Sequence, residues 1–373
     1  MADTQQDWVL QLCHGYDGPF LDCARQYAAL FKGTPYKVCT VYLTGEENEE
    51  VRIGSESDKV IFLNYRSRQL RGLKINPIRA IRRLHKSLSF KFCLAHRYKP
   101  TYVALMATEV PVCGINHAFG VYDKLSRQLF ARAFRKRLNL ICVSDAVRGN
   151  IRNKLNWSHT KIETLYNRIN INAVQDQQLS RSDSRTFLGL PNDAWIIGNV
   201  GRLHPDKDQQ TLIKGFASAV PRLPDHSLLV LIGTGRLEED LRGLARKLNV
   251  ESKVMFLGQV PNAKYYFKAF DVFVLTSDHE PFGMVLLEAM AAGLPIIASN
   301  CGGAKEIVSG YGEPFPLGDH NKLAEKLVTT KAADTNFAAK SFICLKESFS
   351  DESARNTFWS LAMIAPFRQE EVI

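Results

Sequence analysis

Short apolar runs alternate with longer amphipathic runs along almost the whole chain, and this alternation occurs twice. Runs of this kind are typical of buried strands and of the helices between them. In the first half we expect strands at residues 8–13, 38–43, 60–63, 102–106 and 140–143, and helices at 21–31, 77–92 and 123–137. In the second half we expect strands at 194–200, 227–232, 253–257, 272–275 and 295–298, and helices at 208–220, 236–248, 265–270 and 282–292.

Continuous apolar strands that alternate with helices predict parallel sheets covered on both faces. A polar stretch around residues 175–184 separates the two series. The sequence therefore predicts an α/β protein with two doubly wound Rossmann-like domains, at residues 1–172 and 185–350. Such domains bind ligands at the carboxyl ends of their strands, so we expect a site in a cleft between them.

Positive charge is concentrated in the first half of the chain. The whole sequence has 48 Lys and Arg against 38 Asp and Glu, a net charge of +10, and residues 65–154 have 20 Lys and Arg against three acids. A charge run on its own is often only a solvated face, but an excess across half a domain favours attraction to an anionic surface or acceptor.

Cysteine spacing and hydropathy indicate the compartment. The eight cysteines include no Cys-x-x-Cys pair, so reduced core thiols are expected. The amino-terminal residues have no basic region followed by an apolar one, and the apolar stretch at 282–299 contains Glu288, Gly293 and Pro295. We therefore expect a cytoplasmic protein without a membrane-spanning helix.

The most informative motif is Glu280-Pro281-Phe282-Gly283-Met284, followed by Val285-Leu286-Leu287-Glu288. It follows an expected strand and opens an apolar helix, with Pro281 expected in the first helical turn. Glu288 is the only charge between Glu280 and residue 298, so we expect it to have a charged partner or a ligand.

The spacing of the two glutamates limits their chemistry. Eight helical residues would separate Glu280 and Glu288 by about 12 Å, whereas paired glycosidase carboxylates lie about 5–9.5 Å apart. The pair is better suited to holding two parts of an extended ligand. Backbone N–H groups of residues 282–285 could accept an anion between those parts, as in a sugar joined through a diphosphate to a ribose.

Two further loops carry candidate phosphate-binding groups. Gly201-Arg202-Leu203 and the later Lys207 leave one strand with two cations five residues apart. The neighbouring Asp206 and Asp208 match an Asp-x-Asp metal motif by letter, but helix capping is a simpler explanation. Gly233 and Gly235 follow another strand without a third glycine, so a nicotinamide site is excluded, while a nucleotide-binding turn and simple loop geometry both remain open.

Together these motifs resemble the retaining glycosyltransferases of family 4, which have the GT-B fold. Phe256-Leu257-Gly258 and residues 301–306 extend the resemblance, which is dense from 195 to 315 and loose in the first half. The resemblance implies a central cleft between the domains, an acceptor-binding domain at 1–172, a donor-binding domain at 185–350 and a helix at 351–373 that crosses back to the first domain.

The resemblance also implies roles for individual residues. Arg202 and Lys207 would hold the diphosphate of a nucleotide-sugar donor, Glu280 the hydroxyls of the transferred sugar and Glu288 those of the ribose. Backbone N–H groups of Phe282, Gly283 and Met284 would contact the donor, with Gly233 at its nucleotide and Val260 near its base. His117 would lie beside the donor sugar, although a lone histidine could equally be structural, and Gly18 would approach the phosphates.

The implied reaction is transfer of a hexose, from a UDP-linked donor, with retention of configuration and without a metal or other cofactor. Glu280, Arg202, Lys207 and His117 would be its catalytic residues. The basic first half suits an anionic lipid-linked glycan, such as the lipopolysaccharide core, at the inner membrane face, with the basic amphipathic segment 77–86 on the membrane.

Three alternatives stay open on the sequence alone. A nucleotide-sugar epimerase would share the donor site. A nucleic-acid-binding protein would use the basic half, although no nucleic-acid-binding motif is present and we expect no nucleic-acid partner. A peripheral membrane scaffold would use the same basic face but leave the donor motifs unexplained.

Overall fold

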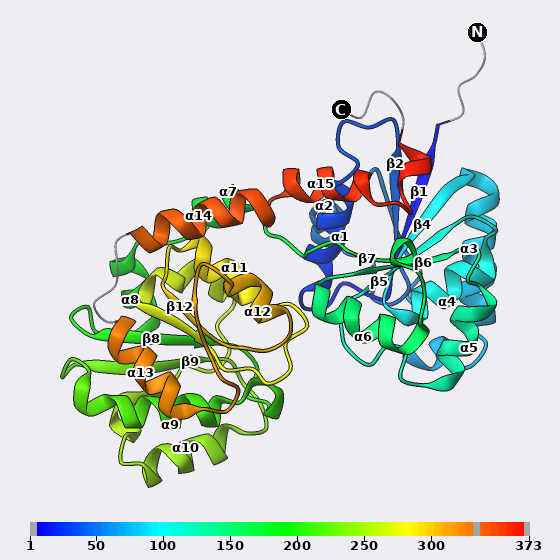
Figure 1. The fold of residues 1–373 in the computed structure, drawn as a ribbon. Coiled ribbons are helices and arrows are strands. Elements are labelled where there is room, and N and C mark those ends of the chain that lie inside the picture. The colour runs from blue at the N-terminus through cyan, green and yellow to red at the C-terminus, as the bar shows by residue number, and fades with distance from the viewer. Residues whose placement is uncertain (1–5, 331–335, 369–373) are drawn as a thin grey trace. The chain divides into compact units, whose positions relative to one another are not determined.

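The structure is a computed structural model that describes residues 6–330 and 336–368 of the 373-residue chain. The described residues form two compact units. The first runs to Asn167 and takes in the segment from Asp351 onward, and the second is Arg168–Ser350. Each unit has a parallel sheet with helices on both faces (Figure 1), so the doubly wound α/β architecture is confirmed.

The first unit has a seven-stranded parallel sheet in the order β3-β2-β1-β4-β5-β6-β7. Its strands are β1 (Trp8–Cys13), β2 (Lys37–Tyr42), β3 (Lys59–Phe62), β4 (Phe90–His96), β5 (Val112–Asn116), β6 (Leu138–Cys142) and β7 (Ile162–Thr164). The order reverses between β1 and β4, which pair directly. This reversal creates a crevice at the carboxyl ends of these two strands, the usual place for a ligand in such sheets.

Helices cover both faces of the first sheet. They are α1 (Phe20–Ala29), α2 (Glu49–Gly54), α3 (Ile75–Leu88), α4 (Tyr98–Ala107), α5 (Leu125–Ala133), α6 (Asp145–Leu155) and α15 (Asp351–Ser360), with 3₁₀ turns η1 (Ser67–Leu70), η2 (His159–Lys161) and η7 (Ala365–Phe367). Helices α3, α4 and α5 lie on one side of the sheet and α1 on the other (Figure 1).

Two sequence predictions in this unit are wrong. Residues 102–106 are not a strand but lie inside α4, and the expected helix at 77–92 ends at Leu88, after which β4 begins at Phe90. A short apolar run does not distinguish a buried strand from a buried helix, because neither shows an exposed face. Ser89, with φ 51°, ends the helix in a left-handed conformation, a reversal that the side-chain pattern does not predict.

The second unit has a six-stranded parallel sheet in the order β10-β9-β8-β11-β12-β13. Its strands are β8 (Trp195–Val200), β9 (Ser227–Ile232), β10 (Val254–Phe256), β11 (Val272–Leu275), β12 (Ile296–Ser299) and β13 (Glu313–Phe315). Here the order reverses between β8 and β11, so the loops that follow these two strands flank the ligand-binding edge.

The helices of the second unit start within the expected linker. They are α7 (Ile171–Gln177), α8 (Arg181–Leu188), α9 (Gln209–Ala219), α10 (Glu238–Lys247), α11 (Met284–Ala291), α12 (Gly302–Val308), α13 (His320–Thr330) and α14 (Asn336–Ser348), with 3₁₀ turns η3 (Pro205–Lys207), η4 (Val220–Arg222), η5 (Glu251–Lys253) and η6 (Ala263–Ala269). The polar stretch at 175–184 is therefore part of this unit, and the segment expected to be a helix at 265–270 is a 3₁₀ turn.

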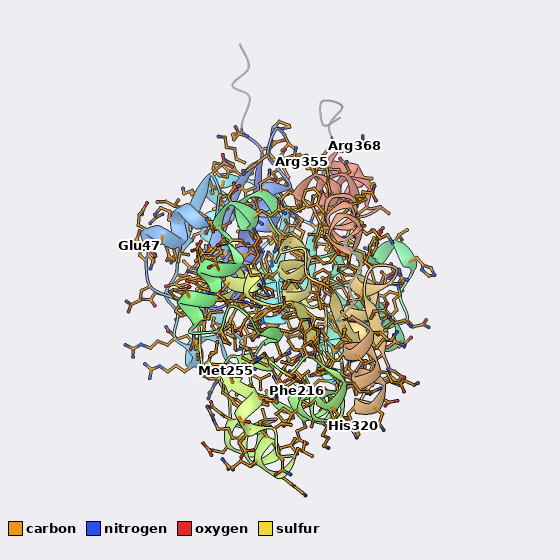
Figure 2. The ribbon with its side chains drawn as sticks, turned by 90° about the vertical axis from the view of Figure 1, so that its left-hand side faces the viewer. Glu47, Phe216, Met255, His320, Arg355 and Arg368 are labelled. Atoms are coloured by element: carbon orange, nitrogen blue, oxygen red, sulfur yellow. The ribbon has the colours of Figure 1, made fainter. Side chains whose placement is uncertain are left out.

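Each unit has its own hydrophobic core. In the first, side chains from α1 and the sheet pack with Phe358 and Trp359 of α15. In the second, Phe216 of α9, labelled in Figure 2, packs among the strands and α13. All eight cysteines are free thiols, and seven of them are buried, as the spacing predicts. Burial raises the pKa of the Cys142 thiol to about 12.

Candidate functional site

Two loops meet at the strand reversal of the second sheet. The loop after β8 carries Arg202 and Lys207, and the loop after β11 carries Glu280. The Thr276 hydroxyl donates to the Lys207 carbonyl oxygen at 2.9 Å, and the Asp278 N–H donates to the Asp206 carbonyl oxygen at 3.1 Å. These hydrogen bonds fix the two loops against each other, so the residues that they carry are held in one place.

A buried ion pair joins the two loops. Lys207 Nζ lies 2.7 Å from Glu280 Oε2, and the Ser277 hydroxyl donates to the same oxygen at 3.2 Å. The two side chains are only 19% and 9% exposed. A charged pair this far from water requires good geometry, because desolvation offsets much of its attraction. The structure thus brings together two residues that the sequence placed in separate motifs.

Arg202 is placed differently from Lys207. Its side chain is 71% exposed and lies 3.4 Å from the Asp206 carboxylate, a contact typical of a weak surface pair. The Asp206 carboxylate also accepts a hydrogen bond from His204 Nδ1. Asp208 caps α9 by accepting from the Thr211 N–H and hydroxyl. Capping and ion pairing thus account for both aspartates of the Asp-x-Asp motif.

The segment from Glu280 to Glu288 is not one helix. Helix α11 begins at Met284, and its N-cap Gly283 has φ 107°, so Glu280 and Pro281 lie in the preceding turn. The predictions that Pro281 begins the helix and that a helical rise separates the two glutamates are therefore wrong. Glycine is required here because a left-handed φ disfavours residues with a Cβ. The first N–H groups of α11, at Met284 and Val285, have no acceptor within the helix, as at any helix start.

Glu288 and Val260 are both half-buried in the second unit. Glu288 lies within α11, where its carbonyl oxygen accepts from the Ala292 N–H. Val260 lies in the irregular segment after β10, where it is not held by a helix or strand.

Gly233 and Gly235 have a packing function that explains both of them. A Cβ on Gly233 would lie 2.0 Å from the Gly201 carbonyl oxygen, and one on Gly235 would lie 2.2 Å from that of Leu203. The Leu203 N–H donates to the Thr234 carbonyl oxygen at 3.0 Å. The glycines thus allow the loop after β9 to lie on the loop that carries Arg202 and Lys207. Of the two interpretations left open by the sequence, close loop packing is the one with structural support.

Several contacts around Glu280 were not anticipated from the sequence. The Gly303 N–H donates to the Glu280 carbonyl oxygen at 2.8 Å, and a Cβ on Gly303 would lie 2.5 Å from the Pro281 carbonyl oxygen. Cys301 Sγ donates to the Ser277 carbonyl oxygen at 2.9 Å. The repeated glycine after β12 was the available signal, since such pairs often mark a close backbone approach.

The remaining predicted residues belong to the first unit. Gly18 is exposed between β1 and α1 with φ 60°, and nothing lies near where its Cβ would be. His117 follows β5, and its Nε2 lies 3.2 Å from His96 Nδ1. Burial, followed by the positive charge of Arg97, lowers the pKa of His117 to about 4. His117 is therefore neutral at pH 7 and can exchange a hydrogen bond without carrying charge.

His117 also lines a basic pocket at the strand reversal of the first sheet. This pocket has a volume of about 300 Å³, and we call it the switch-point pocket. It is lined by His14, Arg97, Tyr98, Lys99, Pro100, Asn116, His117, Ala118, Phe119, Gly120, Val121 and Arg127. The sequence located the basic region that supplies these cations but not their convergence on one cavity.

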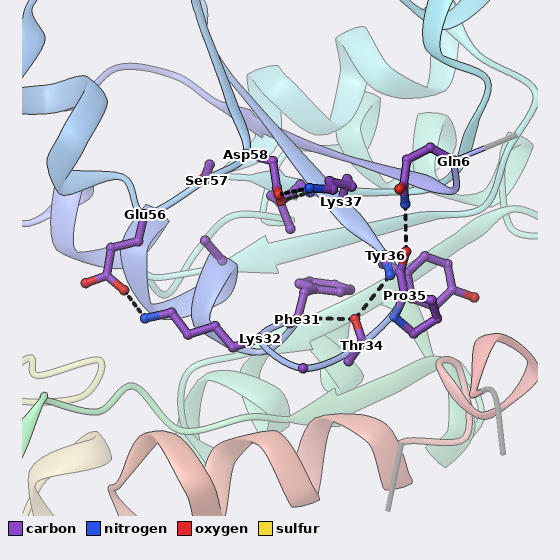
Figure 3. A pocket seen from close by; sticks show the side chains of 13 residues that line it. Gln6, Phe31, Lys32, Thr34, Pro35, Tyr36, Lys37, Glu56, Ser57 and Asp58 are labelled. Carbon is purple, nitrogen blue, oxygen red and sulfur yellow. Dashed lines mark hydrogen bonds and ion pairs between the residues drawn. The ribbon is translucent and has the colours of Figure 1, made fainter. Parts of the chain in front are cut away.

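A larger cavity of about 530 Å³ lies elsewhere in the first unit, around the start of β2 (Figure 3). Its lysines are already paired, Lys32 with Glu56 and Lys37 with Asp58. It lies at the amino ends of the strands, opposite the edge where doubly wound sheets bind ligands. The smaller switch-point pocket is therefore the better candidate for a functional site.

Two negative findings apply to residues 6–330 and 336–368. No helix in these ranges is long and apolar enough to cross a membrane. Within the same ranges no three His, Cys, Asp or Glu side chains are grouped so that they could hold a metal ion.

Each unit is similar to a known protein family. Residues 180–329 match the family described as glycosyl transferases group 1, and residues 21–173 match glycosyltransferase family 4. The chain is 32% identical over 226 residues to an uncharacterized glycosyltransferase of Methanocaldococcus jannaschii, a match covering 58% of this chain and 55% of the relative. It is 32% identical to the lipopolysaccharide core biosynthesis glycosyltransferase LpsE of Rhizobium meliloti, over 49% of this chain and 54% of the relative.

These alignments span about half the length of the two relatives. Among solved structures, Anabaena HepE in complex with UDP and glucose superposes with a TM-score of 0.74, at 21% identity, over 93% of this chain and 97% of that chain. The two parallel sheets match this structure, so the chain has the GT-B fold, and each unit is similar to one glycosyltransferase family.

Proposed function

We propose that this GT-B protein is a retaining glycosyltransferase of the group 1/family 4 type that moves a hexose from a UDP-linked donor to an anionic glycan or glycolipid. The buried Lys207–Glu280 pair at the strand reversal of the second sheet is the observation that carries the proposal. It holds one cation and one carboxylate beside the start of α11. A diphosphate and sugar hydroxyls require these groups at neighbouring points.

The donor would be held by groups from two loops and from helix α11. Lys207 and the exposed Arg202 would contact the diphosphate, and the N–H groups at the start of α11 would contact its oxygens. Glu280 would accept hydrogen bonds from the transferred sugar, and Glu288 from the ribose. The bound UDP and glucose of the Anabaena neighbour support this choice of donor. Positive charge at the diphosphate would stabilise the leaving group as negative charge develops on it.

The choice of acceptor has weaker support and belongs to the same proposal. The LpsE relative acts in lipopolysaccharide core biosynthesis by its printed name, and the first unit of this chain carries the basic stretch 65–154. An anionic lipid-linked saccharide at the cytoplasmic membrane face would complement that charge. A nucleotide-sugar epimerase and a nucleic-acid-binding protein are not favoured by the family matches.

Donor binding can be tested by thermal unfolding with UDP, GDP, ADP and CMP. A ligand at 100 times its dissociation constant adds about 2.7 kcal/mol to stability. Arg202→Gln is the most useful variant because the exposed side chain contributes little to folding. Arg246→Gln, also exposed and in the same unit, is the matched control. UDP should stabilise the wild type and Arg246→Gln but not Arg202→Gln. Absence of any nucleotide effect on the folded wild type would refute the proposal.

Transfer itself requires a second assay. Incubation of a transferase with UDP-hexose and acceptor extracts should release UDP only when acceptor is present. An epimerase would not consume the nucleotide sugar, so acceptor would not cause it to release UDP. The anomeric configuration of the product, measured by NMR, decides between retention and inversion. An inverted product would contradict the retaining mechanism while leaving glycosyl transfer intact.

Peripheral membrane contact is the other part of the proposal. Leu73 and Ile75 are 70% and 51% exposed at the start of the basic helix α3, and Leu125 and Leu129 are 64% and 53% exposed on α5. Apolar side chains among cations are typical of a surface that lies on anionic lipid. We expect co-sedimentation with vesicles containing phosphatidylglycerol, but not with phosphatidylcholine alone.

A paired substitution tests the membrane surface. Leu73→Asn with Ile75→Asn should weaken vesicle binding several-fold. Ile53→Asn, which changes an equally exposed residue on α2 on the other side of the sheet, should leave binding unchanged. Equal effects of both changes would contradict a docking surface at α3.

A further inference from the structure

The switch-point pocket lies where a doubly wound sheet binds ligands. His14 follows β1, Arg97 follows β4 and His117 follows β5, so the pocket opens at the carboxyl ends of three adjacent strands. The strand order reverses between β1 and β4, which separates the loops on either side of them. The volume of about 300 Å³ exceeds that of a lone ion and is at the lower end of small-molecule sites.

Three cations line this pocket and no carboxylate does. Arg97 and Lys99 come from the start of α4, and Arg127 comes from α5. In the described parts of the chain none of the three forms an ion pair. In the larger cavity of the same unit, by contrast, Lys32 and Lys37 are both paired. Like charges that converge without counter-charges repel one another, so the pocket favours an anionic ligand.

The two arginines are held in place by aromatic rings. The Arg127 guanidinium lies 4.6 Å from the ring centre of Tyr98 and donates from Nη1 to the Val121 carbonyl oxygen at 2.8 Å. The Arg97 guanidinium lies 4.8 Å from the ring centre of Phe20. A stacked guanidinium keeps its edge N–H groups free for other acceptors. Both arginines are thus positioned in advance, which lowers the entropy cost of binding an anion.

The backbone at Arg97 is also unusual. This residue has φ 75° and ψ 167°, a region that residues with a Cβ rarely adopt. Its N–H donates to the Ile115 carbonyl oxygen at 2.9 Å, and its carbonyl oxygen accepts from the Thr101 hydroxyl at 2.9 Å. These bonds hold the residue at the start of α4, whose first N–H groups add to the positive potential of the pocket.

The two histidines add neutral hydrogen-bonding groups. Burial, and then the charges of Lys99 and Arg97, lower the pKa of His14 below its usual value. Burial likewise leaves His117 neutral at pH 7. His14 Nδ1 is buried and has no hydrogen-bond partner among the described residues. Neutral imidazoles bind hydroxyl groups, so the pocket combines cations for an anion with nitrogens for a sugar.

We propose that the switch-point pocket binds a phosphate monoester carried by a sugar, with Arg97, Lys99 and Arg127 as its ligands. A phosphate monoester carries close to two negative charges at pH 7 and three acceptor oxygens. Two arginine forks and one ammonium group complement it better than they complement a single carboxylate. The identification of this phosphosugar as part of the acceptor rests on the proposed glycosyltransferase function.

The pocket can be tested by titrating the full chain with glucose 6-phosphate, using glucose at matched ionic strength as the uncharged control. Isothermal titration should detect binding of glucose 6-phosphate and not of glucose. Lys99→Gln and Arg127→Gln should each weaken binding about tenfold or more. Arg132→Gln, which removes one charge from an exposed position on α5 outside the pocket, is the matched control and should bind like the wild type.

Two results would overturn the proposal. One is undetectable binding of glucose 6-phosphate to the folded wild type. The other is equal loss in Arg132→Gln and in the two pocket variants, which would indicate general charge attraction. Circular dichroism of each variant confirms that it is folded, and the two independent pocket variants prevent one misfolded protein from deciding the result.

The source of the phosphate is distinguished by vesicles. Stronger retention on phosphatidic acid than on phosphatidylglycerol, lost in Lys99→Gln, would identify a lipid-borne phosphomonoester. Binding of glucose 6-phosphate without that preference would identify a phosphate on the glycan. Either result supports the pocket.

A UDP titration of the same proteins separates this inference from the proposed function. Binding of UDP without binding of glucose 6-phosphate would refute the phosphate pocket and leave donor binding intact. Binding of glucose 6-phosphate without any nucleotide binding would leave the pocket intact and refute the transferase.

Discussion

Replacement of Lys207 by Met should destabilise the second unit even without a ligand. Glu280 is 7% exposed, and its carboxylate would retain only the hydroxyl of Ser277, 3.2 Å away, among the side-chain partners described for it. At 2.7 Å the Coulomb attraction is about 6 kcal/mol for an effective dielectric constant of about 20, and desolvation offsets part of it. Loss of one partner of such a pair costs about 3–5 kcal/mol. We expect about 2–4 kcal/mol because the Ser277 bond persists.

The assay is urea unfolding of four proteins: the wild type, Lys207→Met, Glu280→Gln and the double variant. The double variant removes both charges, so it should be more stable than the sum of the single effects predicts, with a coupling energy of at least about 1 kcal/mol. Lys247→Met, at an exposed position of α10, is the control and should change stability by less than about 0.5 kcal/mol.

Additive single effects, within about 0.5 kcal/mol, would refute the reasoning. So would a Lys207→Met protein that is as stable as the wild type.

Three further predictions concern stability. Gly235→Ala should lower the free energy of unfolding in urea by about 2–4 kcal/mol, since its Cβ would lie 2.2 Å from the Leu203 carbonyl oxygen. Gly243→Ala, inside helix α10 where a Cβ meets no close atom, should be neutral or stabilising. The pKa of His117 is lowered in the folded state, so the unfolded state binds more protons than the folded state between about pH 6.5 and 4. The free energy of unfolding of the wild type should therefore fall by at most about 3 kcal/mol as the pH falls through that window, and it should fall less steeply in His117→Asn. Arg185→Met should lower the free energy of unfolding by about 3–5 kcal/mol because this buried arginine is paired to Asp271. Arg181→Met should lower it by less than about 1 kcal/mol because its side chain, which pairs to the same aspartate, is 52% exposed. Equal urea midpoints for the two variants would contradict this difference.

The sequence by itself determined the architecture and the positions of the motifs that contain Lys207 and Glu280. Strand alternation, apolar runs and glycine turns are local properties of the backbone, so strands such as Ser227–Ile232 and Val272–Leu275 could be predicted to the residue. The loop containing Lys207 and the turn containing Glu280 follow strands for the same reason. Where local signals conflict, prediction failed: the apolar run at 102–106 fits a strand or a buried helix equally well.

Only the tertiary structure decided which of these residues meet. Lys207 and Glu280 are 73 positions apart, and their ion pair depends on β8 and β11 being neighbours at the strand reversal. The switch-point pocket likewise collects Arg97, Lys99 and Arg127 from two helices around one sheet edge. Charge counts along the chain locate a basic region but not its geometry, because side-chain convergence is set by strand order and helix packing rather than by local propensity.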